Sequence, residues 1–267
     1  MGNGGYRLEI RLDNKRALVT GASSGIGEAV ALTLAASGAD IGLNYVAHPE
    51  AAQAVAQQIQ AGGRRAFAVR ADVSDPDAVR EMFAKMDQEF GGIDILINNA
   101  GIDGGRMEAK EADLVAWRKV IEVNLFGAFY CSHEALKRMV PQKSGVILNL
   151  SSVHEVIPWS GYSAYAVSKA GLSMLTKTLA QEVAGLGIRV LAVGPGAIQT
   201  EINRPVWSNP ESLQDLLEKI PAGRMGTSEE IANVVTVLVS DVAGYITGHT
   251  VFVDGGMTDY PLFRHGG

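Results

Sequence analysis

The residues most able to do chemistry are gathered in SSVHEVIPWSGYSAYAVSK, residues 151–169. Lys169 follows Tyr165 by four residues, so a helix over 163–182 would place both side chains on one face. A free tyrosine titrates near ~10, and a cation within a few ångströms lowers that pKa. The spacing therefore predicts a phenol that acts as a general base beside an ammonium group. An ordinary surface pair of tyrosine and lysine is the alternative interpretation.

Two serines precede this pair. Ser152 lies at the end of the strand predicted over 145–152, where its hydroxyl could stabilise the charge that develops on a reacting oxygen. Ser151 is expected to point to the opposite face of that strand. Tyr162 has an alanine, not a lysine, four residues later and is left without a partner. Ser152 and Tyr165 together provide the stabiliser and the base that hydride transfer at an alcohol carbon requires.

A second motif, TGASSGIG at 20–27, follows a short apolar strand and precedes a helix. Glycines in such a turn allow close backbone approach, so that a pyrophosphate can lie on the N-terminus of the helix. A plain structural turn is the alternative. The expected dinucleotide contacts in this motif are Gly21, Ser23, Ser24, Gly25, Ile26 and Gly27.

The end of the second predicted strand bears on the choice of cofactor. Proteins that prefer NAD place an Asp or Glu there to bind the ribose 2′-hydroxyl. Residues 43–48, LNYVAH, contain no acid and no arginine, so NADP is favoured and NAD is also possible. Further contacts to the nucleotide are expected at the ends of the second, third and fourth strands: Asn44, Tyr45, Asp72, Val73, Asn99, Ala100 and Gly101. A helix-capping role for Asp72 and a simple turn at NNAG are the alternatives.

The elements that must position these groups alternate between strand and helix. Strands are predicted over 16–20, 40–46, 65–73, 93–100, 145–152, 188–196 and 250–256. They are almost continuously apolar, which indicates a sheet buried on both faces. Alternation with amphipathic helices predicts an α/β, doubly wound parallel sheet with helices on both faces. No linker divides the chain, so residues 1–267 form a single expected domain, with a tail at 1–13 and a substrate lid, rich in loops, at 201–224.

Composition excludes several classes of function. The 267 residues carry a formal net charge of −6, which gives no electrostatic basis for binding nucleic acid or an anionic membrane. A single cysteine, Cys131, excludes an internal disulfide, and the five histidines show no ligand spacing, so no metal is expected. No signal peptide or membrane span is evident, and a cytoplasmic protein is expected.

These motifs together resemble the short-chain dehydrogenase/reductase family. The resemblance rests on TGASSGIG, NNAG, Asn124 in VIEVNLFGAF, Ser152, Tyr165-x-x-x-Lys169 and PGAIQT at 195–200, in this order along the chain. It implies a Rossmann-type fold with a seven-stranded parallel sheet, a nicotinamide cofactor and a homotetramer. It also implies that Lys169 binds the nicotinamide ribose and that Asn124 holds a proton-relay water, although a buried asparagine that bonds backbone is the alternative. Nicotinamide contacts are implied at Pro195, Gly196, Ile198 and Thr200.

Three stretches are similar to one subgroup, the bacterial glucose 1-dehydrogenases: SSVHEVIPW, GPGAIQTEIN and DGGMTDYPLF. This similarity implies oxidation of a sugar, with substrate contacts from Asp103, Ser152, His154, Tyr165 and Asn203. Glu155 is equally compatible with an exposed loop charge and an ion pair, and Trp207 with a lid anchor and plain packing. The apolar tail residues Tyr260, Leu262 and Phe263 suggest an intersubunit contact.

Other functions are compatible with the same motifs. A 3-oxoacyl carrier-protein reductase, or another carbonyl reductase of the family, is the main alternative. A catalytically silent NADP-binding regulator would need no intact set of Asn124, Ser152, Tyr165 and Lys169, and that set is complete here.

Overall fold

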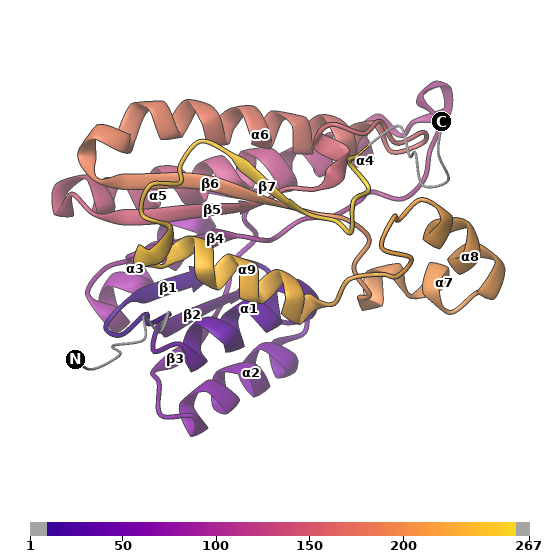
Figure 1. The fold of residues 1–267 in the computed structure, drawn as a ribbon. Coiled ribbons are helices and arrows are strands. Elements are labelled where there is room, and N and C mark those ends of the chain that lie inside the picture. The colour runs from indigo at the N-terminus through magenta and orange to yellow at the C-terminus, as the bar shows by residue number, and fades with distance from the viewer. Residues whose placement is uncertain (1–9, 260–267) are drawn as a thin grey trace, which may run out of the picture.

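The computed structural model describes residues 10–259, and within them seven strands form one parallel sheet in the order β3-β2-β1-β4-β5-β6-β7 (Figure 1). Each strand falls inside its predicted range: β1 (Arg16–Val19), β2 (Asp40–Tyr45), β3 (Ala66–Arg70), β4 (Ile95–Asn98), β5 (Gly145–Leu150), β6 (Ile188–Pro195) and β7 (Thr250–Val253). The expected Rossmann-type sheet is thus confirmed. The strand order reverses between β1 and β4, and in such sheets ligands bind at the carboxyl ends beside that reversal.

Helices cover both faces of the sheet, as the alternating pattern predicted. One face carries α1 (Gly25–Ala36), α2 (Pro49–Ala61) and α9 (Ser228–Val239). The other carries α3 (Pro76–Phe90), α5 (Gly127–Gln142) and α6 (Ser163–Val183), with α4 (Leu114–Ile121) packed against α6. Successive strand residues serve opposite faces: Ala17 and Val19 pack on the first layer and Leu18 on the second.

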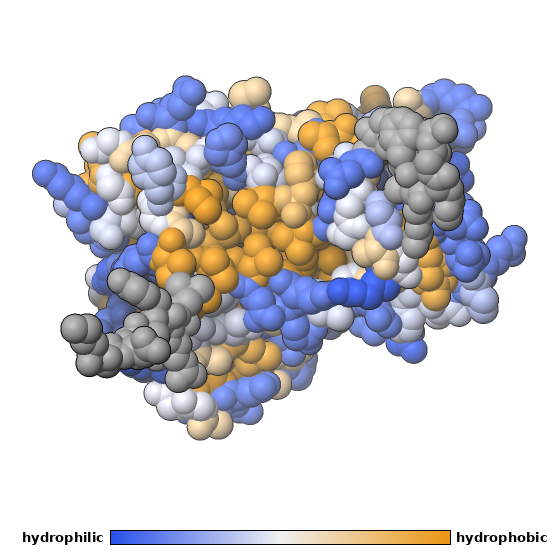
Figure 2. All heavy atoms as spheres, in the orientation of Figure 1, coloured by the Kyte–Doolittle hydropathy of each residue, from blue (hydrophilic) through white to orange (hydrophobic). Residues whose placement is uncertain are grey.

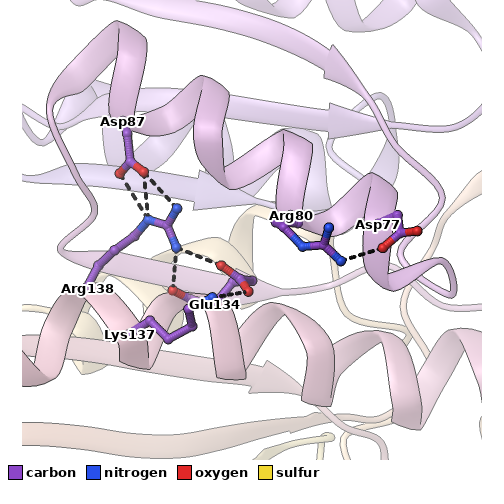
Figure 3. A network of polar contacts seen from close by, with 6 residues as sticks. All are labelled: Asp77, Arg80, Asp87, Glu134, Lys137 and Arg138. Atoms are coloured by element: carbon purple, nitrogen blue, oxygen red, sulfur yellow. Dashed lines mark hydrogen bonds and ion pairs between the residues drawn. The ribbon is translucent and has the colours of Figure 1, made fainter.

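Polar contacts fix α5 against α3 (Figure 3). Arg138 on α5 donates to Asp87 of α3 at 2.7 Å and to the buried Glu134 of its own helix at 2.9 Å. Lys137 also donates to Glu134, at 2.9 Å. Because α5 continues directly from a turn of π-helix at Glu122–Phe126, this brace also fixes the turn that carries Asn124.

The predicted lid is helical, which corrects the expectation of a loop-rich segment. Two short helices, α7 (Arg204–Trp207) and α8 (Pro210–Glu218), follow β6 in the chain and lie beyond the end of the sheet (Figure 1). Asn209 begins α8 by accepting from two backbone amides, so a loop-forming residue acts here as a helix cap. The Trp207 indole donates to the Thr200 carbonyl at 2.9 Å, which ties α7 to the segment that follows β6.

Two further findings concern residues 10–259 only. No helix in this range is long and apolar enough to cross a membrane. The same range contains no group of three or more His, Cys, Asp and Glu side chains able to hold a metal ion. The tail residues Tyr260, Leu262 and Phe263 lie outside the described residues.

Candidate active site

The glycine turn between β1 and α1 has the geometry of a phosphate cradle. Gly21 and Gly25 have positive φ values of 62° and 59°, in the left-handed region that favours glycine. A β-carbon on Gly27 would lie 2.3 Å from the Gly21 carbonyl oxygen, so no larger residue fits there. Ser24 is the N-cap of α1 but makes no side-chain capping bond. The first amides of α1 are therefore free to receive an anion, and the turn fits a dinucleotide pyrophosphate.

Two amide side chains hold this turn in place. Asn44 accepts from the Gly21 amide at 3.2 Å and donates to the Ala71 carbonyl at 2.9 Å. Asn99 donates to the carbonyls of Thr20 and Gly21 at 2.8 and 2.9 Å. Asn44, a predicted cofactor contact, has its side chain beneath the turn, because the end of β2 is buried between β1 and β3.

Of the two predicted cofactor contacts that follow β3, Asp72 has a partly exposed side chain and Val73 a buried one. Asp72 accepts from the Ser74 hydroxyl and from Lys119, at 2.7 and 3.0 Å, and its side chain stays partly exposed. It does not cap α3, because Asp75 does so. The Val73 side chain is buried in the core, where it packs against Gly127, so only its backbone can face a nucleotide.

The PGAIQT segment runs from the end of β6 towards the glycine turn. A β-carbon on Gly25 would lie 3.7 Å from a Thr200 methyl group, so the two segments meet there. The Ile198 side chain is buried, and its carbonyl accepts from the Asn203 amide at 2.9 Å. The structure therefore brings Thr200 to the cradle but engages the amide of Asn203, a predicted substrate contact, with backbone.

Tyr165, Lys169 and Ser152 converge at the carboxyl end of β5. Tyr165 and Lys169 share a face of α6, as their spacing predicted. Lys169 is only 5% exposed, and its Nζ donates to the Leu150 carbonyl at 2.7 Å and lies 5.6 Å from the centre of the Tyr165 ring. The Ser152 hydroxyl is buried and accepts from the His154 amide at 3.2 Å.

The pKa of Tyr165 is shifted in the direction opposite to the sequence-based prediction. Burial raises the pKa of Tyr165, a hydrogen bond with Ser152 opposes that rise, and the nearby Asp103 carboxylate adds to it. Burial also lowers the pKa of Lys169 to about 8, against the effect of Glu155. The net shift of the Tyr165 pKa is therefore upward, opposite to the lowering that the sequence predicted.

Asn124 uses its side-chain amide on the protein itself. Its Oδ1 accepts from the Ile102 amide and its Nδ2 donates to the Ile102 carbonyl, both at 2.8 Å. The Nδ2 also donates to Ser168 at 3.0 Å. This arrangement matches the alternative of a buried asparagine that bonds backbone, and it holds the loop that carries Asp103 close to Lys169.

A stack of aromatic rings lines the site, and sequence reasoning missed it. Trp159 lies between His154, with centroids 4.2 Å apart, and Tyr162, with centroids 3.8 Å apart. The Tyr165 ring stands edge-on to both Trp159 and His154. The three-residue spacing of Trp159, Tyr162 and Tyr165 is the sequence signal for this stack. Tyr162 was excluded as a base because no lysine follows it four residues later.

A backbone carbonyl and burial fix the protonation state of His154. Its Nδ1 lies 3.0 Å from the Ile157 carbonyl, which can only accept, so Nδ1 carries the hydrogen. Burial lowers the pKa of His154 and outweighs that hydrogen bond, so the ring is neutral at pH 7. The Nε2 atom of a neutral ring protonated at Nδ1 is a hydrogen-bond acceptor.

Comparison with known proteins defines the family. Residues 21–258 match a family model described as enoyl-(acyl carrier protein) reductase. The chain is 44% identical over 256 residues to the 3beta-hydroxysteroid dehydrogenase 1 of Eggerthella lenta, covering 96% of this chain and 98% of that protein. It is 44% identical to the 3-oxoacyl-[acyl-carrier-protein] reductase FabG of Staphylococcus aureus, over 91% of this chain and 98% of that protein.

A solved structure extends the comparison. A gluconate 5-dehydrogenase from Burkholderia cenocepacia, in complex with NADP and tartrate, matches with a TM-score of 0.89 and 33% identity, over 94% of this chain and 98% of that one. The chain therefore belongs to the short-chain dehydrogenase/reductase family. It is an oxidoreductase of a family that uses NAD or NADP.

Proposed function

We propose that this protein transfers hydride between NADP, or NAD, and a hydroxyl-bearing carbon of a sugar or related polyhydroxylated small molecule. The observation that carries this proposal is the neutral His154 beside Tyr165, with Nδ1 committed to Ile157 and Nε2 left as an acceptor. Such an acceptor suits a substrate with a second hydroxyl next to the reacting one. Asp103 offers a second acceptor near the phenol.

In oxidation, the Tyr165 phenolate takes the proton of the substrate hydroxyl, and a bound nicotinamide would supply the acceptor for the hydride that leaves the substrate carbon. Ser152 donates a hydrogen bond to the reacting oxygen and stabilises negative charge on it. Protonated Lys169 stabilises the phenolate and would hold the ribose of a bound nicotinamide cofactor. In reduction the same proton returns from Tyr165 to the carbonyl oxygen.

The preference for NADP is supported by Arg70, which sequence reasoning missed. Arg70 ends β3 and pairs in register with Tyr45 of β2. Its Nε donates to the Val46 carbonyl at 3.3 Å, so the guanidinium lies against the turn after β2. A cation there suits a ribose 2′-phosphate. The pairing of two distant strands, and not residues 43–48 themselves, brings this charge to the turn.

A hydroxysteroid is a second candidate substrate, because apolar side chains near the site are exposed. Val156 is 59% and Ile202 is 71% exposed, and Ile102 and Trp159 are partly exposed as well. Such a rim suits a large apolar ring system, and one relative is named for such a substrate. Reduction of a 3-oxoacyl carrier protein, the activity named for another relative, is the remaining alternative.

A substrate panel watched through NADPH absorbance tests the proposal. The panel pairs glucose and gluconate with their 2-deoxy forms and adds a 3β-hydroxysteroid and a 3-oxoacyl thioester. We expect turnover of a polyol and a loss of about tenfold when the neighbouring hydroxyl is removed. Faster turnover of the steroid or the thioester than of any polyol would contradict the proposal.

We also propose that the protein is a homotetramer. Figure 2 shows apolar side chains gathered on one face, over β7 and α9. Separate exposed apolar residues lie on the helices of the opposite layer or on the turn that leads into them, among them Phe126, Phe129, Val167 and Met174. Two distinct self-complementary faces are what a tetramer with dihedral symmetry requires. Sedimentation that gives a stable monomer would contradict this.

A further inference from the structure

Glu155 is enclosed by hydroxyl groups from three separate parts of the fold. It accepts hydrogen bonds from Ser151 after β5, from Ser173 of α6 at 2.9 Å and from Thr250 of β7 at 3.2 Å. It is neither the exposed loop charge nor the ion-pair partner considered from the sequence. Three hydroxyl donors fix the position of this carboxylate relative to the sheet and to α6.

This charge lies in the catalytic region. Ser151 directly precedes Ser152, and Ser173 lies one helical turn after Lys169 on the same face of α6. No Lys, Arg or His forms an ion pair with Glu155 in the part of the chain that the structure describes. The cation that its charge acts on is Lys169, which is itself buried and bound only to the Leu150 carbonyl.

We propose that Glu155 is a positioning residue that keeps the buried Lys169 protonated, and thereby favours the charged pair of Tyr165 phenolate and Lys169 ammonium over the neutral pair of phenol and amine. The two pairs hold the same number of protons and differ only in where one proton lies. Burial favours the neutral pair, whereas a fixed anion beside the lysine favours the charged one. This inference rests on the proposed role of Tyr165 as the base.

The other groups around the pair act in different ways. Glu155 opposes the effect of burial on the pKa of Lys169, whereas Asp103 acts on Tyr165 and raises the phenol pKa. The neutral His154 faces Tyr165 with its ring edge-on. At the carboxyl end of β5 the pair meets the Leu150 carbonyl and the hydroxyl of Ser152, and Glu155 accepts from the Thr250 hydroxyl of β7. Glu155 is therefore the group whose removal acts selectively on Lys169.

The test is the pH dependence of NADPH binding, followed by cofactor fluorescence, together with that of kcat/KM. In Glu155→Gln we expect the alkaline loss of both quantities to move to lower pH by about one pH unit, because Lys169 then loses its proton more readily. Glu182→Gln, which removes an exposed carboxylate near the far end of α6, is the control and should leave both profiles in place. Unmoved profiles in Glu155→Gln would overturn the proposal.

Two further variants test the same proposal. If Glu155→Gln does not fold, Ser151→Ala loosens the carboxylate and should move the profiles in the same direction by less, and unmoved profiles there also overturn the proposal. Glu155→Asp restores the charge and should bring the profiles back towards wild type. The binding arm needs no substrate, so a shifted NADPH profile without turnover of any substrate in the panel would refute the proposed function and leave this inference standing.

Discussion

At the carboxyl ends of β1 and β4, the groups proposed to bind the nucleotide belong to the backbone. After β5, the groups proposed to bind the substrate are side chains. The cofactor turn depends on Gly27 lying against Gly21 and on two amide side chains that bond carbonyls and amides. The proposed substrate wall is built from His154 and Trp159, which stack on each other. A backbone cradle binds what all family members share, and a side-chain wall can change with the substrate.

The largest effect should follow from a β-carbon in the cradle. Gly27→Ala places that atom 2.3 Å from the Gly21 carbonyl oxygen and 2.4 Å from Asn99 Nδ2, so the turn must shift. We expect cofactor affinity to fall by more than about tenfold and stability to fall by about 1–3 kcal/mol. Fluorescence titration and thermal unfolding measure these changes. Gly185→Ala, where a β-carbon meets nothing within 4 Å, is the control, and an equal loss there would contradict the account.

A change in the substrate wall should leave the cradle intact. His154→Ala removes the Nε2 acceptor, and we expect KM for the substrate to rise about tenfold while the Kd for cofactor stays the same. Steady-state kinetics and cofactor titration on one preparation separate the two effects. His249→Ala, an exposed histidine beside β7, serves as the control. An unchanged KM in His154→Ala would remove this residue from the substrate site.

The rim of the cradle should control cofactor choice. Arg70→Ala removes the guanidinium from the turn after β2, so we expect the ratio of kcat/KM for NADPH to that for NADH to fall roughly fivefold to tenfold. Arg64→Ala, at the other end of β3, should leave this ratio unchanged. A strong preference for NADH in the wild type would contradict the assignment of NADP from the outset.

The smallest functional effect is expected far from both regions. Arg16 forms a two-pronged pair with Asp94, at 2.7 and 2.8 Å. Burial alone would raise the pKa of Asp94, but the hydrogen bonds and charge of Arg16 outweigh it, and the pKa is lowered. This pair therefore contributes stability above the unfolded pKa of ~3.9 and loses it as pH falls through the lower folded value.

Asp94→Asn should accordingly lower Tm at pH 7, by the equivalent of about 1–2 kcal/mol, and the difference from wild type should shrink in strong acid. Thermal unfolding across pH measures this. Cofactor Kd and substrate KM should not change. A change in either would show that the sheet's amino end is coupled to the site.

Local patterns predicted the strands, the glycine turn and the Tyr165–Lys169 face, because each depends on residues close together in the sequence. Contacts between elements that are far apart in the sequence were not predicted. Arg70 reaches the cofactor rim through β2–β3 pairing, and Glu155 meets hydroxyls of α6 and β7. The role of Asn44 beneath the turn depends on its burial between neighbouring strands, which the sequence does not reveal. The lid was mistaken for a loop because Asn209 and Pro210, residues typical of turns, here begin a helix.

The central claim is that the two regions are separate and that Tyr165 carries the proton chemistry. The most direct test measures NADPH binding and turnover on the same preparation of Tyr165→Phe. We expect turnover to fall by about 10²–10⁴-fold while the Kd for NADPH stays within about twofold of wild type. Turnover close to wild type in this variant would contradict the account.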